Sequence, residues 1–110
     1  MPQELSSHLG LSSITLDKLL CVFKCFPAIE QVIAFGSRAK GNYRHGSDID
    51  LAIKGRKLAF NELMQLENQI DDLNMPYTVD LIQYEQLGNR ELVAHIDRVG
   101  IVIYSKPIET

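Results

Sequence analysis

Two aspartates two positions apart, Asp48 and Asp50, lie in a stretch that alternates polar and apolar residues. Residues i and i+2 of a β-strand project from the same face, so this spacing predicts two carboxylates a few ångströms apart. Such anions repel one another unless a cation lies between them, and Mg²⁺ binds one or two carboxylates together with phosphate and water oxygens. Asp80, between Val79 and Leu81, offers a third carboxylate from another predicted strand. The three aspartates predict a two-metal site for phosphoryl or nucleotidyl transfer.

A glycine–serine pair, Gly36 and Ser37, follows a short apolar run and suits a phosphate group. Glycine lets a backbone approach a ligand closely, and Ser37 would open a short helix whose free N–H groups can receive phosphate oxygens. Arg38, Lys40 and Arg44 add cations nearby. Taken singly, a Gly-Ser pair is usually a strand exit and an Asp-x-Asp a solvated strand face. The spaced combination arises by chance in on the order of one in a thousand chains of this length, so together they predict a nucleotide site.

The charge distribution supports a local anion site rather than a general nucleic-acid binder. The net charge is -3, but residues 36–57 carry six basic and two acidic residues, a balance of +4. Residues 1–35 carry two basic and three acidic residues, and residues 58–110 carry three basic and nine acidic residues, which gives -1 and -6. A short basic stretch with two carboxylates suits a small polyanion held with a metal ion, and no direct nucleic-acid partner is expected.

The elements that must position these residues alternate between helix and strand. The expected elements are a helix capped by Thr15 and stopped by Pro27, a strand over 32–35, a strand over 48–54, a helix over 58–73, a strand over 78–83, a helix from Asn89 to near Gly100 and a strand over 101–104. On the middle strand, Ile49, Leu51 and Ile53 would face inward. This order predicts an α/β fold, a small mixed sheet with helices packed on it.

Length and composition predict one domain over residues 1–110, with residues 1–13 a loose lead-in. The chain has 110 residues, of which 45% are hydrophobic and 23% charged, values typical of a globular domain and not of a disordered chain. No apolar run approaches the roughly 20 residues that span a bilayer, and the N-terminus lacks the pattern of a secretory signal. We therefore expect a cytoplasmic protein without membrane association.

Some chemically capable side chains receive ordinary interpretations. Cys21 and Cys25, four apart on a predicted helix, have the wrong geometry for an easy disulfide and no second Cys/His pair at zinc spacing. We expect reduced, partly buried thiols. His8 is expected in the lead-in, His45 in a solvated loop, and His95 at a surface or half-packed position on the last helix.

The motif Gly36-Ser37, ten residues and then Asp48-Ile49-Asp50 resembles the signature of the DNA polymerase β-like nucleotidyltransferase superfamily, and the short chain resembles its minimal nucleotidyltransferase branch. The resemblance extends from about residue 30 to residue 103 and implies a nucleotidyltransferase-like fold. It implies that the Gly-Ser pair contacts the phosphates of ATP. It further implies that Asp48 and Asp50 hold two Mg²⁺ ions and that Asp80 completes the site as general base.

Minimal members of this family resemble antitoxins that transfer AMP from ATP to a tyrosine of a HEPN-domain ribonuclease toxin. Larger transferases carry a C-terminal domain that holds the acceptor, and a chain of this length has no room for one. The resemblance therefore implies an acceptor on a co-encoded HEPN partner in a hetero-oligomer. Two alternatives stay open: a small-molecule nucleotidyltransferase, and a non-catalytic nucleotide-binding subunit that neutralises its partner by binding.

Overall fold

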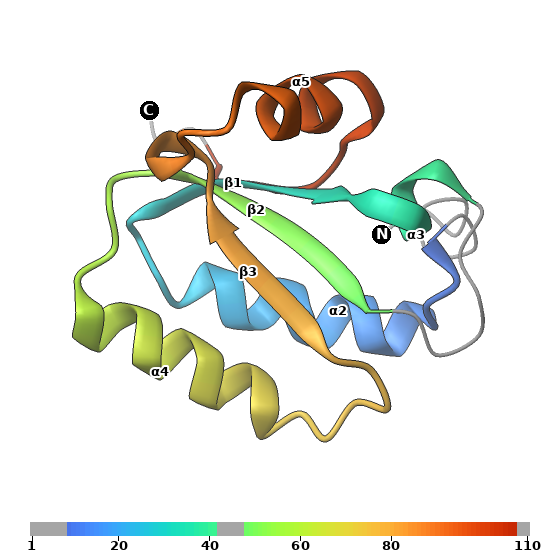
Figure 1. Ribbon diagram of the computed structural model, residues 1–110. Helices are drawn as coiled ribbons and strands as arrows, with labels where there is room; N and C mark the ends of the chain where they lie inside the picture. Colours follow the sequence, from blue (N-terminus) through green and yellow to red (C-terminus); the bar gives the residue numbers. More distant parts are fainter. Residues whose placement is uncertain (1–8, 42–47, 108–110) are drawn as a thin grey trace.

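A four-stranded mixed sheet with helices on both faces forms the centre of the computed structural model (Figure 1). The structure describes residues 9–41 and 48–107, except for the side chain of Ser37. The elements in chain order are α2 (Ser13–Lys24), β1 (Ile29–Phe35), α3 (Gly36–Lys40), β2 (Ile49–Gly55), α4 (Phe60–Asp71), β3 (Val79–Gln83), the 3₁₀ turn η1 (Tyr84–Gln86), α5 (Arg90–Val99) and β4 (Ile101–Ser105). The predicted α/β class with a small mixed sheet is confirmed. Among the helices of the described residues, none is long and apolar enough to cross a membrane.

The strand order β3-β2-β1-β4 places β1 and β2 at the centre. β1 runs antiparallel to both β2 and β4, whereas β2 and β3 are parallel. In this register Asp50 is opposite Phe35 on one side and Asp80 on the other. Residues opposite one another on adjacent strands project from the same face, so the register alone brings two of the predicted site aspartates together.

The two faces of the sheet bury cores of different size. The larger core lies between the sheet and helices α2 and α4, and it contains the inward-facing Ile49, Leu51 and Ile53 of β2, as the alternation predicted. The opposite face is covered by α5, where Ile96 packs with Phe35 in a smaller cluster that also holds Ile33 and Ala52. Asp50 alternates with the larger-core residues and therefore lies on the α5 side.

The start of the chain differs from its prediction. Leu9 and Leu11 are only 2% and 6% exposed and belong to the larger core, so residues 9–13 are not a loose lead-in; residues 1–8, with His8, lie outside the described part. Ser12, not Thr15, caps the first helix, because the Ser12 hydroxyl accepts a hydrogen bond from the Thr15 N–H at 3.0 Å. The periodic pattern predicts the helix but not its first residue, because Ser12 and Thr15 both have a hydroxyl that can cap a helix.

The remaining element predictions hold with shifts of a few residues at most. Asn89 caps α5 as expected, since its side-chain oxygen accepts from the N–H groups of Glu91 and Leu92. Cys21 and Cys25 are free, as predicted, but both are exposed rather than partly buried. They lie on the solvent side of α2, whose other face supplies the buried leucines.

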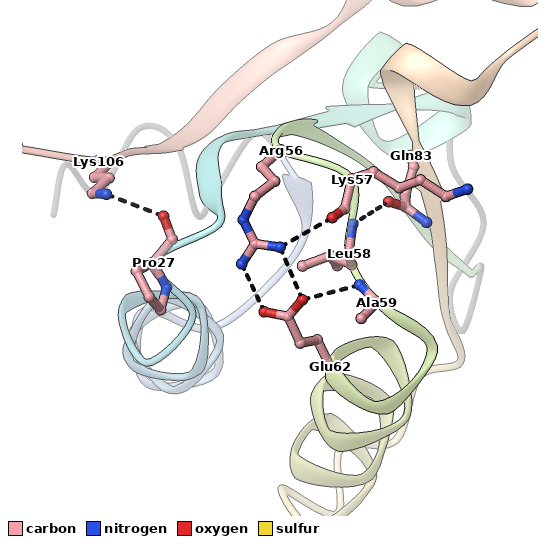
Figure 2. Close-up of polar contacts among 8 residues, drawn as sticks. All are labelled: Pro27, Arg56, Lys57, Leu58, Ala59, Glu62, Gln83 and Lys106. Atoms are coloured by element: carbon pink, nitrogen blue, oxygen red, sulfur yellow. Dashed lines mark hydrogen bonds and ion pairs between the residues drawn. The ribbon is translucent and has the colours of Figure 1, made fainter.

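Polar contacts fix the end of the sheet where β2 leaves it (Figure 2). The Arg56 guanidinium forms two hydrogen bonds with the Glu62 carboxylate, at 3.1 and 2.9 Å, and Glu62 also accepts from the Ala59 N–H at the start of α4. The Leu58 N–H donates to the side-chain oxygen of Gln83 at 2.9 Å, which ties the loop before α4 to the end of β3. The loop from β2 to α4 is therefore held by a side chain of α4 and a side chain of β3.

Candidate active site

The candidate site lies at the end of the sheet where β1 ends and β2 begins. Asp50 on β2 and Asp80 on β3 are direct neighbours in the parallel register, and the Asp80 carboxylate is near enough to raise the pKa of Asp50. Asp48 is exposed and lies immediately before β2, near enough to act electrostatically on Asp50. The structure therefore brings Asp50 and Asp80 together on the face covered by α5, with Asp48 at the rim.

The environment of Asp50 opposes the ionisation of its carboxyl. Partial burial raises the pKa of the Asp50 carboxyl above its usual value, and the nearby Asp80 and Asp48 carboxylates raise it further. His95 acts in the opposite direction. A carboxyl whose ionisation is opposed by two neighbouring carboxylates marks a place where a cation would be stabilised.

Within residues 9–41 and 48–107, no group of three or more His, Cys, Asp or Glu side chains is arranged to hold a metal ion. The predicted three-carboxylate set of Asp48, Asp50 and Asp80 thus stays a prediction. The Asp50–Asp80 pair is the part that fits a divalent cation, because it offers two adjacent hard oxygen donors whose mutual repulsion a cation would relieve. These two residues, with Asp48 at the rim, would hold Mg²⁺.

Gly36 follows β1 as the first residue of α3, and its backbone has a conformation that favours glycine. Its φ is +77°, a left-handed value that side-chain-bearing residues rarely adopt. A Cβ built on Gly36 would collide with the Asp50 carboxylate, so the glycine backbone takes the space next to this carboxylate. Ser37 follows in α3, and its side chain lies outside the described part of the chain. The structure thus places the Gly-Ser turn directly beside the aspartate pair.

Arg38 does not lie in the open position expected of a phosphate ligand. It is 2% exposed, and its Nη1 donates to the Leu9 carbonyl at 2.7 Å and the Gly10 carbonyl at 3.5 Å. Its guanidinium carbon lies 4.6 Å from the centre of the Tyr77 ring. Arg38 therefore joins α3 to the N-terminal segment and to the chain before β3, and its contact with the triphosphate stays a prediction.

The other basic residues that the structure describes in the stretch 36–57 lie toward opposite ends of β2. Lys40 is exposed at the end of α3, on the side of the site, and its predicted phosphate contact is untested. Lys54 and Arg56 lie at the other end of β2, where the Lys54 amine is 4.3 Å from the centre of the Tyr84 ring and Arg56 pairs with Glu62. A seven-residue strand separates the two groups. Arg44 and His45 lie outside the described residues.

His95 is a site neighbour that the sequence did not identify. Its Nε2 accepts a hydrogen bond from the Gly36 N–H at 3.3 Å, and its ring meets Phe35 edge-on with 6.2 Å between ring centres. The half-packed position expected for it is correct, but its contact with the Gly-Ser turn was missed. Only the α5 amphipathic pattern was available as a signal, and that pattern cannot say which end of the sheet the helix crosses.

Most of the chain matches a known protein family. Residues 17–109 match the family model described as "Polymerase beta, Nucleotidyltransferase". Comparison with curated proteins gives no match.

Several solved structures share the fold. A toxin–antitoxin structure with AMP-PNP is 22% identical, covers 87% of this chain and 75% of its own, and superposes with a TM-score of 0.66. A toxin–antitoxin MntA–HepT structure is 16% identical, with 86% and 74% covered and a TM-score of 0.64. A tri-AMPylated HEPN toxin of Shewanella oneidensis in complex with MNT antitoxin is 17% identical, with 84% and 71% covered and a TM-score of 0.63. Such identities establish a common fold.

Proposed function

The chain belongs to the polymerase beta nucleotidyltransferase family, and from this membership we propose that it transfers AMP from ATP to a tyrosine hydroxyl of a HEPN-type toxin partner, as the antitoxin of the pair. The observation that carries the proposal is the neighbouring Asp50 and Asp80 carboxylates with the Gly36 turn against them. The similar structures supply the context, since one contains an ATP analogue and another an AMPylated HEPN toxin with an MNT antitoxin.

In the proposed reaction, the tyrosine oxygen attacks the α-phosphorus of ATP. A bond forms between this oxygen and the α-phosphorus, the bond from the α-phosphorus to the bridging oxygen breaks, and pyrophosphate leaves. The hydroxyl proton passes to the Asp80 carboxylate, which is exposed and can meet an acceptor arriving from solution. Mg²⁺, held by the aspartates, would neutralise the charge on the phosphates.

The chain's own contribution is positioning. Gly36 brings backbone close to the reacting phosphates without a side chain in the way, and Lys40 at the end of α3 would contact the triphosphate as a point charge. Asp50, half-buried between β1 and β3, is held by the sheet itself rather than by a loop. Groups on a rigid sheet keep the reacting atoms aligned, and alignment contributes a large part of the rate of such transfers.

Co-expression with the product of the adjacent gene, which the proposal expects to be a HEPN-type protein, tests the proposal. Intact mass spectrometry of the purified partner should show increments of AMP that map to a tyrosine, and they should be lost with Asp50→Asn and with EDTA. A stable complex without increments would favour the non-catalytic binding subunit. Labelled AMP on a small molecule, with none on the partner, would favour the small-molecule transferase.

A further inference from the structure

His95 lies where it can control the shape of the glycine–serine turn. It is half-buried on α5, and α5 packs on the face of the sheet that carries Asp50. Its Nε2 accepts a hydrogen bond from the Gly36 N–H at 3.3 Å, and the planes of the His95 and Phe35 rings make an angle of 81°. The same imidazole thus contacts both the last residue of β1 and the first residue of α3.

The Gly36 N–H is a sensitive point for such a contact. Gly36 has the positive φ of +77°, and the Asp50 carboxylate occupies the space where a Cβ would be. Glycine is the residue that gives up the most conformational freedom when it is fixed. A hydrogen bond to its N–H restricts the peptide plane between Phe35 and Gly36. Any rotation of that plane would move the turn relative to Asp50.

The helix that carries His95 is itself fixed at both ends. Asn89 caps its first turn, and the Tyr84 hydroxyl donates to the Asp97 carboxylate at 2.7 Å near its last turn. Between these contacts, Ile96 is 1% exposed in the smaller core. A side chain held on an anchored helix can position a partner more accurately than one on a loop.

We propose that His95 is a positioning residue of the active site. It accepts a hydrogen bond from the Gly36 N–H and so holds the Gly36–Ser37 turn at a fixed distance from Asp50. This inference rests on the proposed nucleotidyl transfer for its effect on rate, but its structural part does not. An imidazole nitrogen that accepts a hydrogen bond carries no proton, so neutral His95 must be protonated on Nδ1. The inference therefore specifies a tautomer as well as a contact.

The test compares three variants of the full chain in the transfer assay with its partner. His95→Leu removes the acceptor and keeps an apolar side chain. His95→Gln restores an acceptor oxygen close to the position of Nε2. Arg98→Gln changes an exposed residue of the same helix and serves as the control. We expect His95→Leu to lower kcat by about tenfold, the rate equivalent of one lost hydrogen bond, with His95→Gln and the control within about threefold of wild type.

Two measurements read the contact without turnover. Amide hydrogen exchange at Gly36 should be slow in wild type and in His95→Gln and faster in His95→Leu. Long-range proton–nitrogen spectra of the wild-type protein at neutral pH should show His95 protonated on Nδ1. The wild-type spectrum decides the matter even where His95→Leu does not fold.

Each contrary result would overturn the inference. It fails if wild-type His95 carries its proton on Nε2, if Gly36 exchanges as fast in wild type as in His95→Leu, or if His95→Leu keeps wild-type turnover. It also fails if His95→Gln turns over as slowly as His95→Leu while folded. A wild-type chain that transfers no AMP would instead refute the proposed function, and the exchange and tautomer measurements would still decide the contact.

Discussion

Replacing Asp50 by asparagine should stabilise the cation-free protein, although it should abolish transfer. Asp50 and Asp80 are opposite one another on adjacent parallel strands, and the side-chain amide of asparagine preserves the shape of the carboxyl while removing its charge. Because burial and the neighbouring carboxylates raise the Asp50 pKa, the ionised form of this residue opposes folding at neutral pH. Asp50→Asn removes this charge and should therefore raise the free energy of unfolding.

The size of the effect follows from the strand spacing. Two charges about 5 Å apart repel by roughly 1 kcal/mol at the dielectric constant of water and roughly 3 kcal/mol at the effective value near a protein surface. Asp80 is exposed and Asp50 only half-buried, so solvent screening brings the expected gain to about 1 kcal/mol. For a domain of this size, about 1 kcal/mol corresponds to a rise in Tm of roughly 4 °C.

The sign of the pH dependence separates this cause from better packing. The folded pKa of Asp50 lies above its unfolded value, so its destabilising contribution is present above the folded pKa and is relieved as the pH falls through it. The advantage of Asp50→Asn should therefore be largest near pH 7 and should vanish below about pH 3, where the carboxyl is protonated in both states. Thermal unfolding in EDTA from about pH 3 to pH 8 measures this dependence.

Asp80→Asn and the double variant provide the control. Either single substitution removes the same repulsion, so the double variant should gain less than the sum of the two. Added Mg²⁺ should raise the Tm of wild type and have a smaller effect on Asp50→Asn. The reasoning is refuted if Asp50→Asn lowers the Tm at pH 7 in EDTA, or if its gain does not depend on pH.

Three further outcomes are expected. Leu9→Ala should lower the free energy of unfolding by about 2–5 kcal/mol in urea titrations, because Leu9 is a core residue, and a change below 0.5 kcal/mol would contradict this placement. Arg38→Ala should lower the free energy of unfolding by about 1.5–3 kcal/mol, the scale of hydrogen bonds to a charged group. Arg38→Lys should recover only part of this loss. Lys40→Ala should weaken ATP binding by about 1–2 kcal/mol in calorimetric titrations, whereas Lys24→Ala should not; equal affinities would remove Lys40 from the site.

The sequence predicts the sheet and the places of Asp50 and Gly36 in it because both depend on local patterns. Alternation placed Asp50 on the face opposite Leu51, and the run ending at Gly36 marked the exit of a buried strand. The pairing of Asp50 with Asp80 cannot be predicted from local patterns alone, because the topology of the sheet decides which strands are neighbours. The parallel β2–β3 register supplies this step.

Arg38 and His95 show where local patterns fail. Arg38 sits in a basic stretch and was assigned to phosphate, yet carbonyls of the N-terminal segment and the Tyr77 ring surround its guanidinium. His95 looked like an ordinary helix residue. For both residues, the contact that fixes the side chain joins segments 28 or more residues apart along the chain. A spacing pattern in the sequence cannot predict a contact over such a separation. Long-range side-chain contacts are thus the part of the site that only the fold reveals.

The position of β3 explains why Asp80, rather than Asp50, suits the base in the proposed transfer. Asp50 lies on a central strand between Phe35 and Asp80, and its half-buried carboxyl faces Gly36. Asp80 lies on β3, which is an edge strand of the sheet formed by the described residues, and its side chain is exposed. A hydroxyl on another protein can approach an edge strand without crossing backbone. Both carboxylates would hold the cation, and the outer one is in addition the carboxylate that an acceptor hydroxyl can reach.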